Sequence, residues 1–323
     1  MKLILRSDTP HGLMPSAYRY MDQFQTPPAK GGRAYRPILG IYNLSISRCL
    51  DALAQVIEGL IEIQALKMPP DPAQGTEWID SVVDLHSECL LAMESHLDDC
   101  SAIAEAAFSS DGEIRARQSK RFKSMTKGYD DRIGRIVNHL KHHHGRLRGF
   151  VFHSSRECFP GYYVEGVAED GSVGPEPTVH KGGKGAFSFA RDVRLHFVWI
   201  YFLSERLAEI LAARTEPCTR TVSHPTDEKF LSVARRMELI SSSFFPDEAH
   251  GSTPVVKVIE AADGSVELLL RYSTDEMPRR VRRGPGLRIL QNWRSDGVTR
   301  NWRLPYPWMD GPDNVAVISP PKR

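Results

Sequence analysis

The sequence contains few cysteines, and none of them forms a closely spaced pair. The five cysteines are scattered and odd in number, with no Cys-x-x-Cys motif. This usage argues against a disulfide framework and indicates reduced thiols. Residues 197–203, the most apolar run, are far fewer than the roughly 20 that span a bilayer. The apolar run at residues 3–5 is too short for a signal-peptide core. We therefore expect a cytoplasmic protein without a membrane span.

Signatures of common enzymes and of a polyanionic partner are also missing. We find no Gly-x-Ser-x-Gly elbow, His-Glu-x-x-His helix, dinucleotide fingerprint or complete P-loop, so hydrolase, metalloprotease and dehydrogenase functions have no support. The formal net charge of +2 is too small to imply that the whole surface binds a polyanion. Charge can still be segregated locally, and the sequence contains such a segment.

Apolar spacing predicts three long helices in the first half of the chain. Residues 1–44 show no sustained period and are expected to form an irregular arm. Apolar residues then recur at three and four positions, which predicts a helix capped by Ser45 and stopped near Pro69. Two more helices are predicted at about 77–108 and 111–148. Long helices with short connections pack most simply as an antiparallel bundle, here residues 45–148.

The pattern after Gly149 changes to period two with turn signals. Strands are predicted at 150–153 and 162–167, and helices at about 189–213 and 227–243, the first of them buried and central. Hairpin turns are expected at three Asp-Gly pairs, which begin at Asp170, Asp263 and Asp296. The expected fold class is α+β: an N-terminal antiparallel helical bundle followed by helices and antiparallel β-hairpins. Residues 149–323 form either a second domain or one continuous domain with the bundle.

The third predicted helix carries a basic, histidine-rich surface. Its apolar residues, such as Ile133 and Val137, fall on one side at 100° per residue. On the other side the sequence places two polar sets and a preceding run of cations: Arg135, Asn138 and His142; Arg132, His139 and His143; Lys120, Arg121, Lys123 and Lys127. A histidine can exchange a proton at neutral pH, and an arginine can hold a phosphate. These are the requirements of RNA cleavage without a metal.

The spacing of Arg135 and His142, repeated by Arg132 and His139, resembles the arginine-histidine motif of the HEPN superfamily. Its members are helical bundles that often dimerise and cut RNA through paired motifs. The resemblance covers about 20 residues of one helix and implies roles for five of them. Arg135 would bind phosphate, His142 would transfer protons and Asn138 would orient them, with Arg132 and His139 as an adjacent pair. It also implies a homo-oligomer.

A different class of function stays open from the same residues. A basic helix is often a solvated face, or it binds a nucleic acid backbone or an acidic protein partner without catalysis. A second basic cluster lies at Arg279, Arg280, Arg282 and Arg283. Neighbouring helical residues point about 100° apart, so the histidine run cannot surround one ion. His86 with Cys89 and His96 with Cys100 have ligand-like spacing, but buried structural cysteines explain them as well. We therefore expect no metal and no cofactor, and the sequence does not decide whether the protein is an enzyme.

Overall fold

The computed structural model gives the protein an α+β fold, as the sequence predicts. The residues that it describes are 2–21, 24, 29–30, 33–34, 36–65, 72–108, 111–142, 145–153, 158–180, 183–217, 226–246, 248, 253–273, 288–292, 301–306 and 316–319.

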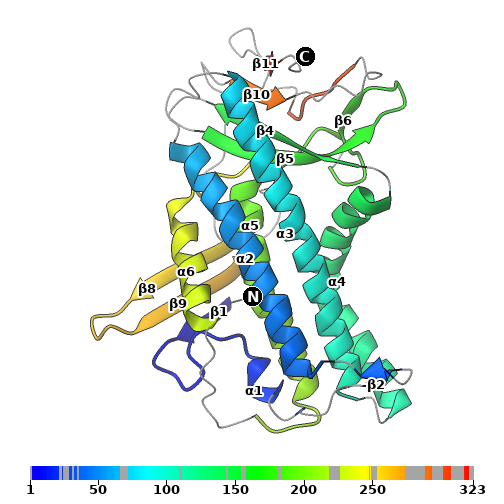
Figure 1. Cartoon of the computed structure of the whole chain (residues 1–323), viewed down its shortest axis with the longest axis vertical. Helices are drawn as coiled ribbons and strands as arrows, with labels where there is room; N and C mark the ends of the chain where they lie inside the picture. The colour runs from blue at the N-terminus through cyan, green and yellow to red at the C-terminus, as the bar shows by residue number, and fades with distance from the viewer. Residues whose placement is uncertain are drawn as a thin grey trace.

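Three long helices run side by side in alternating directions (Figure 1). They are α2 (Ile38–Ala65), α3 (Pro72–Ala106) and α4 (Gly112–His142). The predicted antiparallel bundle is therefore confirmed. The helix predicted to reach residue 148 ends at His142, because the chain continues as a strand from Leu147.

Two expectations about the first 65 residues are wrong. Ser45 does not cap a helix: it lies inside α2, with its hydroxyl oxygen 2.9 Å from Nδ1 of His96. The helix begins earlier because buried Ile38 and Tyr42 extend its apolar face. The first 44 residues are also not wholly irregular, since they contain short elements besides the start of α2. These elements are β1 (Lys2–Arg6), α1 (Tyr18–Met21), β2 (Ala29–Lys30) and β3 (Arg33–Ala34). Pro69, the predicted stop, lies outside the described residues.

A three-stranded sheet contains the predicted hairpin of β8 (Thr253–Glu260) and β9 (Val266–Ser273). Gly264 occupies its turn at a φ of +82°, a conformation that favours glycine. Strand β1 pairs antiparallel with the other edge of β9, which gives the order β1-β9-β8. The N-terminus is thereby joined to a hairpin far along the chain.

A larger sheet has the order β11-β10-β4-β5-β6, with β7 also paired to β5. Its strands are β4 (Leu147–His153), β5 (Cys158–Val167), β6 (Val173–Pro175), β7 (Phe187–Ser188), β10 (Arg288–Asn292) and β11 (Ala316–Ser319). Strand β10 pairs antiparallel with β4 and parallel with β11, so both of its edges are taken. Trp302 pairs with Val173 instead. The hairpin expected around Asp296 would pair the segment before this turn, which contains β10, with the segment after it, and the pairing of β10 shows that this is wrong. The turn itself lies outside the described residues.

Helix α5 (Phe189–Leu211) is the buried central helix that the sequence predicts. One hydrophobic cluster joins it to α2, α3, α4, α6 (Thr226–Leu239) and the β8–β9 hairpin. Buried Arg194 of α5 donates hydrogen bonds to the carbonyl oxygens of Met237 and Ile240, at 2.9 Å each. These carbonyls lie at the end of α6, where a helix leaves its last acceptors unpaired. Arg194 thus has a structural role, because it satisfies the last carbonyl oxygens of α6.

Candidate functional site

The exposed polar face of α4 forms a stripe that we call the basic ridge. It consists of Lys120, Arg121, Lys123, Lys127, Arg135, Asn138 and His142, all of which are exposed. At 100° per residue, all members except Arg121 and Lys123 fall within about 80° of one another, and the ridge extends over about 33 Å. The predicted set of Arg135, Asn138 and His142 therefore shares one accessible face. Nη1 of Arg135 donates to the carbonyl oxygen of Thr178 at 3.2 Å.

The adjacent Arg132 and His139 point toward the body of the protein. Nη2 of Arg132 lies 2.5 Å from Oδ1 of Asp192, and its guanidinium covers the ring of Phe187 at 4.3 Å from the centroid. Nε2 of His139 lies 2.9 Å from the carbonyl oxygen of Glu165. The two Arg-x6-His pairs of the sequence thus lie in different surroundings, one on the surface and one against β5 and α5.

Five predicted ligand-binding residues lie outside the described residues. They are His143, Arg279, Arg280, Arg282 and Arg283.

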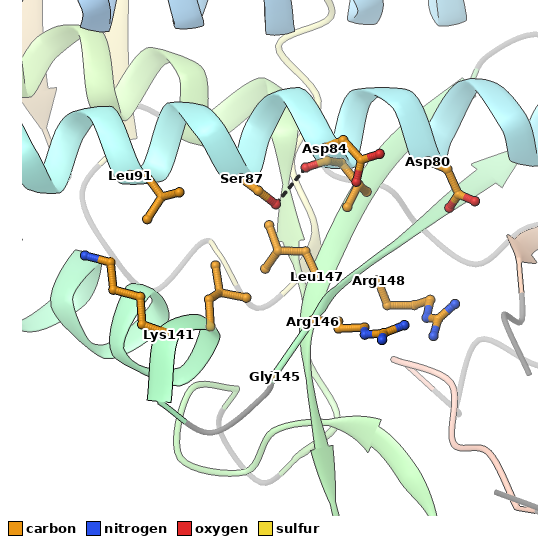
Figure 2. Close-up of a pocket in the computed structure, with 11 residues that line it drawn as sticks. Asp80, Asp84, Ser87, Leu91, Lys141, Gly145, Arg146, Leu147 and Arg148 are labelled. Carbon is orange, nitrogen blue, oxygen red and sulfur yellow. Dashed lines mark hydrogen bonds between the residues drawn. The ribbon is translucent and has the colours of Figure 1, made fainter. Parts of the chain in front are cut away.

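A hollow of about 480 Å³ lies between α3, the end of α4 and the start of β4. Figure 2 shows Asp80 and Asp84 of α3 across from Arg146 and Arg148. Arg148 already donates to Oε1 of Glu165 at 2.7 Å. Because carboxylates and cations both line this hollow, it does not favour a phosphate as the exposed ridge does.

A second polar group is buried beneath α4, and we call it the buried cluster. Its centre is Asp192 and His196 of α5 with His86 of α3, all buried. Asp192 and His196 are four residues apart, so they lie on one face of α5. Nε2 of His86 is 3.8 Å from Oδ2 of Asp192, which is too long for a hydrogen bond. Packing of α3 against α5 brings the three side chains together.

Hydrogen bonds from α4 and β5 surround the buried cluster. The Tyr129 hydroxyl lies 2.8 Å from Nδ1 of His196. The Tyr162 hydroxyl donates to Oδ2 of Asp192, and Arg132 donates to Oδ1. Both carboxylate oxygens therefore have partners. In contrast, three nitrogens have no hydrogen-bond partner among the described residues: both ring nitrogens of His86, and Nε2 of His196.

Burial and charge set the protonation states of the cluster. Burial alone would raise the pKa of Asp192, but Arg132 and the two histidines hold it well below its usual value. Burial lowers the pKa of His196 to about 3, so its imidazole is neutral at neutral pH. Asp192 raises the pKa of Arg132 despite the opposing effect of burial. The cluster therefore combines an ionised Arg132–Asp192 pair with a neutral His196.

Four residues of the buried cluster were not predicted from the sequence: Tyr129, Tyr162, Asp192 and His196. A signal for the last two was present, because Asp192-x3-His196 places an acidic residue and a histidine on one face of the helix that was predicted to be buried. The two tyrosines had no comparable signal. Of the ligand-like pairs in α3, His86 lies at the cluster, whereas His96 contacts Ser45 and lies 3.7 Å from Sγ of Cys100.

Comparisons with known proteins do not indicate a function, so the function has to be inferred from the geometry of the site. No family model, curated protein or solved structure matches the chain. Among the described helices, none is both long and apolar enough to cross a lipid bilayer.

Proposed function

We propose that the basic ridge binds the phosphate backbone of a nucleic acid, with RNA as the leading ligand. One observation carries the proposal: Lys120, Lys127 and Arg135 are exposed on one face of α4 over about 22 Å, with Arg121 and Lys123 exposed beside them. Cations arranged in this way can meet successive phosphates of one strand, and each contact releases condensed counterions.

The ion pairing of the ridge also supports phosphate binding. A helix face that serves only solubility usually alternates charges, with acidic partners four residues from the basic ones. Lys127 has such a partner, with Nζ 3.1 Å from Oδ2 of Asp131. No described carboxylate lies within 4 Å of the charged groups of Lys120, Lys123 or Arg135. These cations keep their charge available for an anion.

Fluorescence anisotropy with a labelled RNA oligonucleotide at several salt concentrations tests the binding. If five ridge cations contact phosphates, the slope of log K against log salt should be about −3.5. A triple variant, K120Q/K127Q/R135Q, should reduce the magnitude of this slope by about 2.

A matched control removes the same charge elsewhere. Arg6, Arg235 and Lys257 are exposed on β1, α6 and β8, on the side of the molecule away from α4 (Figure 1). The variant R6Q/R235Q/K257Q should bind RNA like the parent. Equal losses in the two triple variants would show that overall charge, not the ridge, attracts the RNA.

Cleavage of RNA is a second candidate function, favoured by the shared exposed face of Arg135, Asn138 and His142. The resemblance to HEPN proteins implies the roles. The 2′-hydroxyl would lose a proton to His142 and attack the adjacent phosphate. The bond to the 5′ oxygen would break, and that oxygen would take up a proton. Arg135 would stabilise the phosphorane. RNA incubated with the protein in EDTA should then yield 2′,3′-cyclic phosphate ends, and a His142→Ala variant with full activity would remove His142 from the mechanism.

An acidic protein surface is the alternative ligand of the ridge, and a second copy of the chain could supply it. Asp84 and Glu88 are exposed on α3. Light scattering across a salt series separates this case from RNA binding. Assembly through the ridge requires a homo-oligomer that dissociates as salt increases.

A further inference from the structure

The buried cluster contains metal-ligating side chains that the proposed RNA contacts do not use. One ligand atom from each of His86, Asp192 and His196 lies within 4.8 Å of the other two. We infer that these three residues bind one divalent transition-metal ion, of which zinc(II) and iron(II) suit the ligands best. This inference is independent of the basic ridge, because it rests on different residues and a different chemistry.

The distances require only a small closure around an ion. Metal bonds to histidine nitrogen and carboxylate oxygen are about 2.0–2.2 Å, so two ligand atoms on one tetrahedral zinc ion are about 3.4 Å apart. Nε2 of His86 and Oδ2 of Asp192, at 3.8 Å, are within about 0.5 Å of this separation. The other pairs, which lie within 4.8 Å, need to approach by at most about 1.5 Å, which rotations of the side chains can supply.

The nitrogens without partners are the second observation that points to a ligand. A buried polar group without a hydrogen bond costs about 1–3 kcal/mol. His86 is fully buried, and both of its ring nitrogens lack a hydrogen-bond partner among the described residues, as does Nε2 of His196. The His86 ring is held by aromatic neighbours, with centroids 4.6 Å from Tyr162 and 5.1 Å from Phe189. A metal ion would satisfy one nitrogen of each histidine at the place where both rings meet Asp192.

The hydrogen bond of His196 matches that of a metal ligand. A metal-binding histidine almost always uses its other ring nitrogen in a hydrogen bond, which fixes its orientation. Nδ1 of His196 has this partner in the Tyr129 hydroxyl at 2.8 Å, which leaves Nε2 for the ion. Arg132 holds Oδ1 of Asp192 at 2.5 Å, and Oδ2 accepts from the Tyr162 hydroxyl while it also faces His86, so its second lone pair is the one that an ion would use.

The composition of the site narrows its chemistry. Two imidazoles and one carboxylate suit zinc(II) and non-haem iron(II), and three protein ligands leave positions open for water or substrate. Arg132 already balances the charge of Asp192, so a dication would leave excess positive charge in the core. A fourth ligand should therefore be an anion, such as hydroxide or the carboxylate or phosphate of a substrate.

Metal content after expression tests the inference. The protein is produced without a histidine tag in medium supplemented with zinc(II) or with iron(II), separated from loosely bound ions with a chelator, and analysed by mass spectrometry. We expect about one ion of one of these metals per chain. Because the ligands are buried, the ion should exchange slowly.

Three variants isolate the site. His196→Asn keeps a polar atom for Tyr129 but removes Nε2, and His86→Leu removes a ring that makes no hydrogen bond to the part of the chain that the structure describes. Both should fold, as circular dichroism will show, and both should lose most of the metal. His96→Asn is the matched control, since His96 is also fully buried with Nδ1 bonded to a hydroxyl. It should retain the metal. A parent protein without either metal, or His196→Asn and His86→Leu variants that keep it, would overturn the inference.

Discussion

The basic ridge and the buried cluster use the same residue types, and α4 contributes to both. Arg132 and Arg135 are three residues apart, yet Arg132 forms an ion pair with the buried Asp192 while Arg135 is exposed. His139 and His142 divide in the same way: His139 lies against a backbone carbonyl and His142 is exposed. The difference arises because one side of α4 packs against α5 and β5, whereas the other side is exposed.

The spacing of residues along a helix therefore does not decide their role. In the buried cluster each charge has a fixed partner, so its residues should control stability. On the ridge most charges face water, so its residues should control binding. Substitutions can therefore test whether stability and RNA binding depend on different faces of α4.

The largest effect is expected from Asp192→Asn. It leaves the Arg132 guanidinium without its carboxylate in a site where Asp192 is fully buried. Removal of one partner from a buried ion pair costs about 3–5 kcal/mol, and the lower end applies because the Arg132 side chain is 25% exposed. Denaturant unfolding measures the change. The matched variant Asp131→Asn, on the exposed side of α4, should change stability by less than about 0.5 kcal/mol. Similar losses of stability in the two variants would show that the buried cluster does not stabilise the fold more than the exposed face does.

A smaller effect is expected from pH at His96. Its ring is fully buried, and burial lowers its pKa from 6.5 to about 4. Because the folded protein resists protonation there, stability is complete above pH 6.5 and declines as the pH falls toward 4, by up to about 3 kcal/mol. Unfolding free energies measured from pH 7 to 4 should fall more steeply for the parent than for His96→Asn. Parallel curves would contradict the assignment.

The sequence predicted the bundle and its polar face because helical periodicity is a local property. Ile133 and Val137 are buried and Arg135 is exposed, as their spacing indicates. The start of α2 was not predicted correctly. Serine is a preferred N-cap residue, but Ser45 lies inside a longer helix whose apolar stripe begins at Ile38. Local preference was overruled there by the packing of Ile38 and Tyr42.

The buried cluster could not be assembled from the sequence for a different reason. His86, Tyr129, Tyr162 and Asp192 come from four elements, and only the packing of α3, α4 and β5 around α5 brings them together. The visible signal was an acidic residue in a helix that was predicted to be buried, where a carboxylate needs a partner. That partner, Arg132, had been placed beside Arg135 as part of a surface motif.

A still smaller effect should distinguish these two arginines in RNA binding. Each phosphate contact contributes about 0.7 to the salt slope, which corresponds to about a fivefold change in affinity at 0.1 M salt. Arg135→Gln should therefore weaken RNA binding about fivefold, or about 1 kcal/mol, with little change in stability. Arg132→Gln should lower stability and leave the affinity of the folded protein unchanged. Anisotropy titrations paired with unfolding curves measure both quantities. A reversed outcome would place phosphate contact on the inward pair.

The smallest stability effect is expected at Lys127, where the ridge has its own ion pair. Nζ of Lys127 lies 3.1 Å from Asp131, and the two side chains are 71% and 51% exposed. Exposed pairs of this spacing contribute about 0.3–0.5 kcal/mol, and alanine regains part of that through its helix propensity. Lys127→Ala should thus leave the unfolding free energy nearly unchanged while the salt slope for RNA decreases in magnitude by about 0.7. If stability instead fell by more than about 1 kcal/mol, Lys127 would behave like a residue of the buried cluster, since exposed pairs do not contribute that much. The division of α4 into a binding face and a structural face would then fail at its most exposed cation.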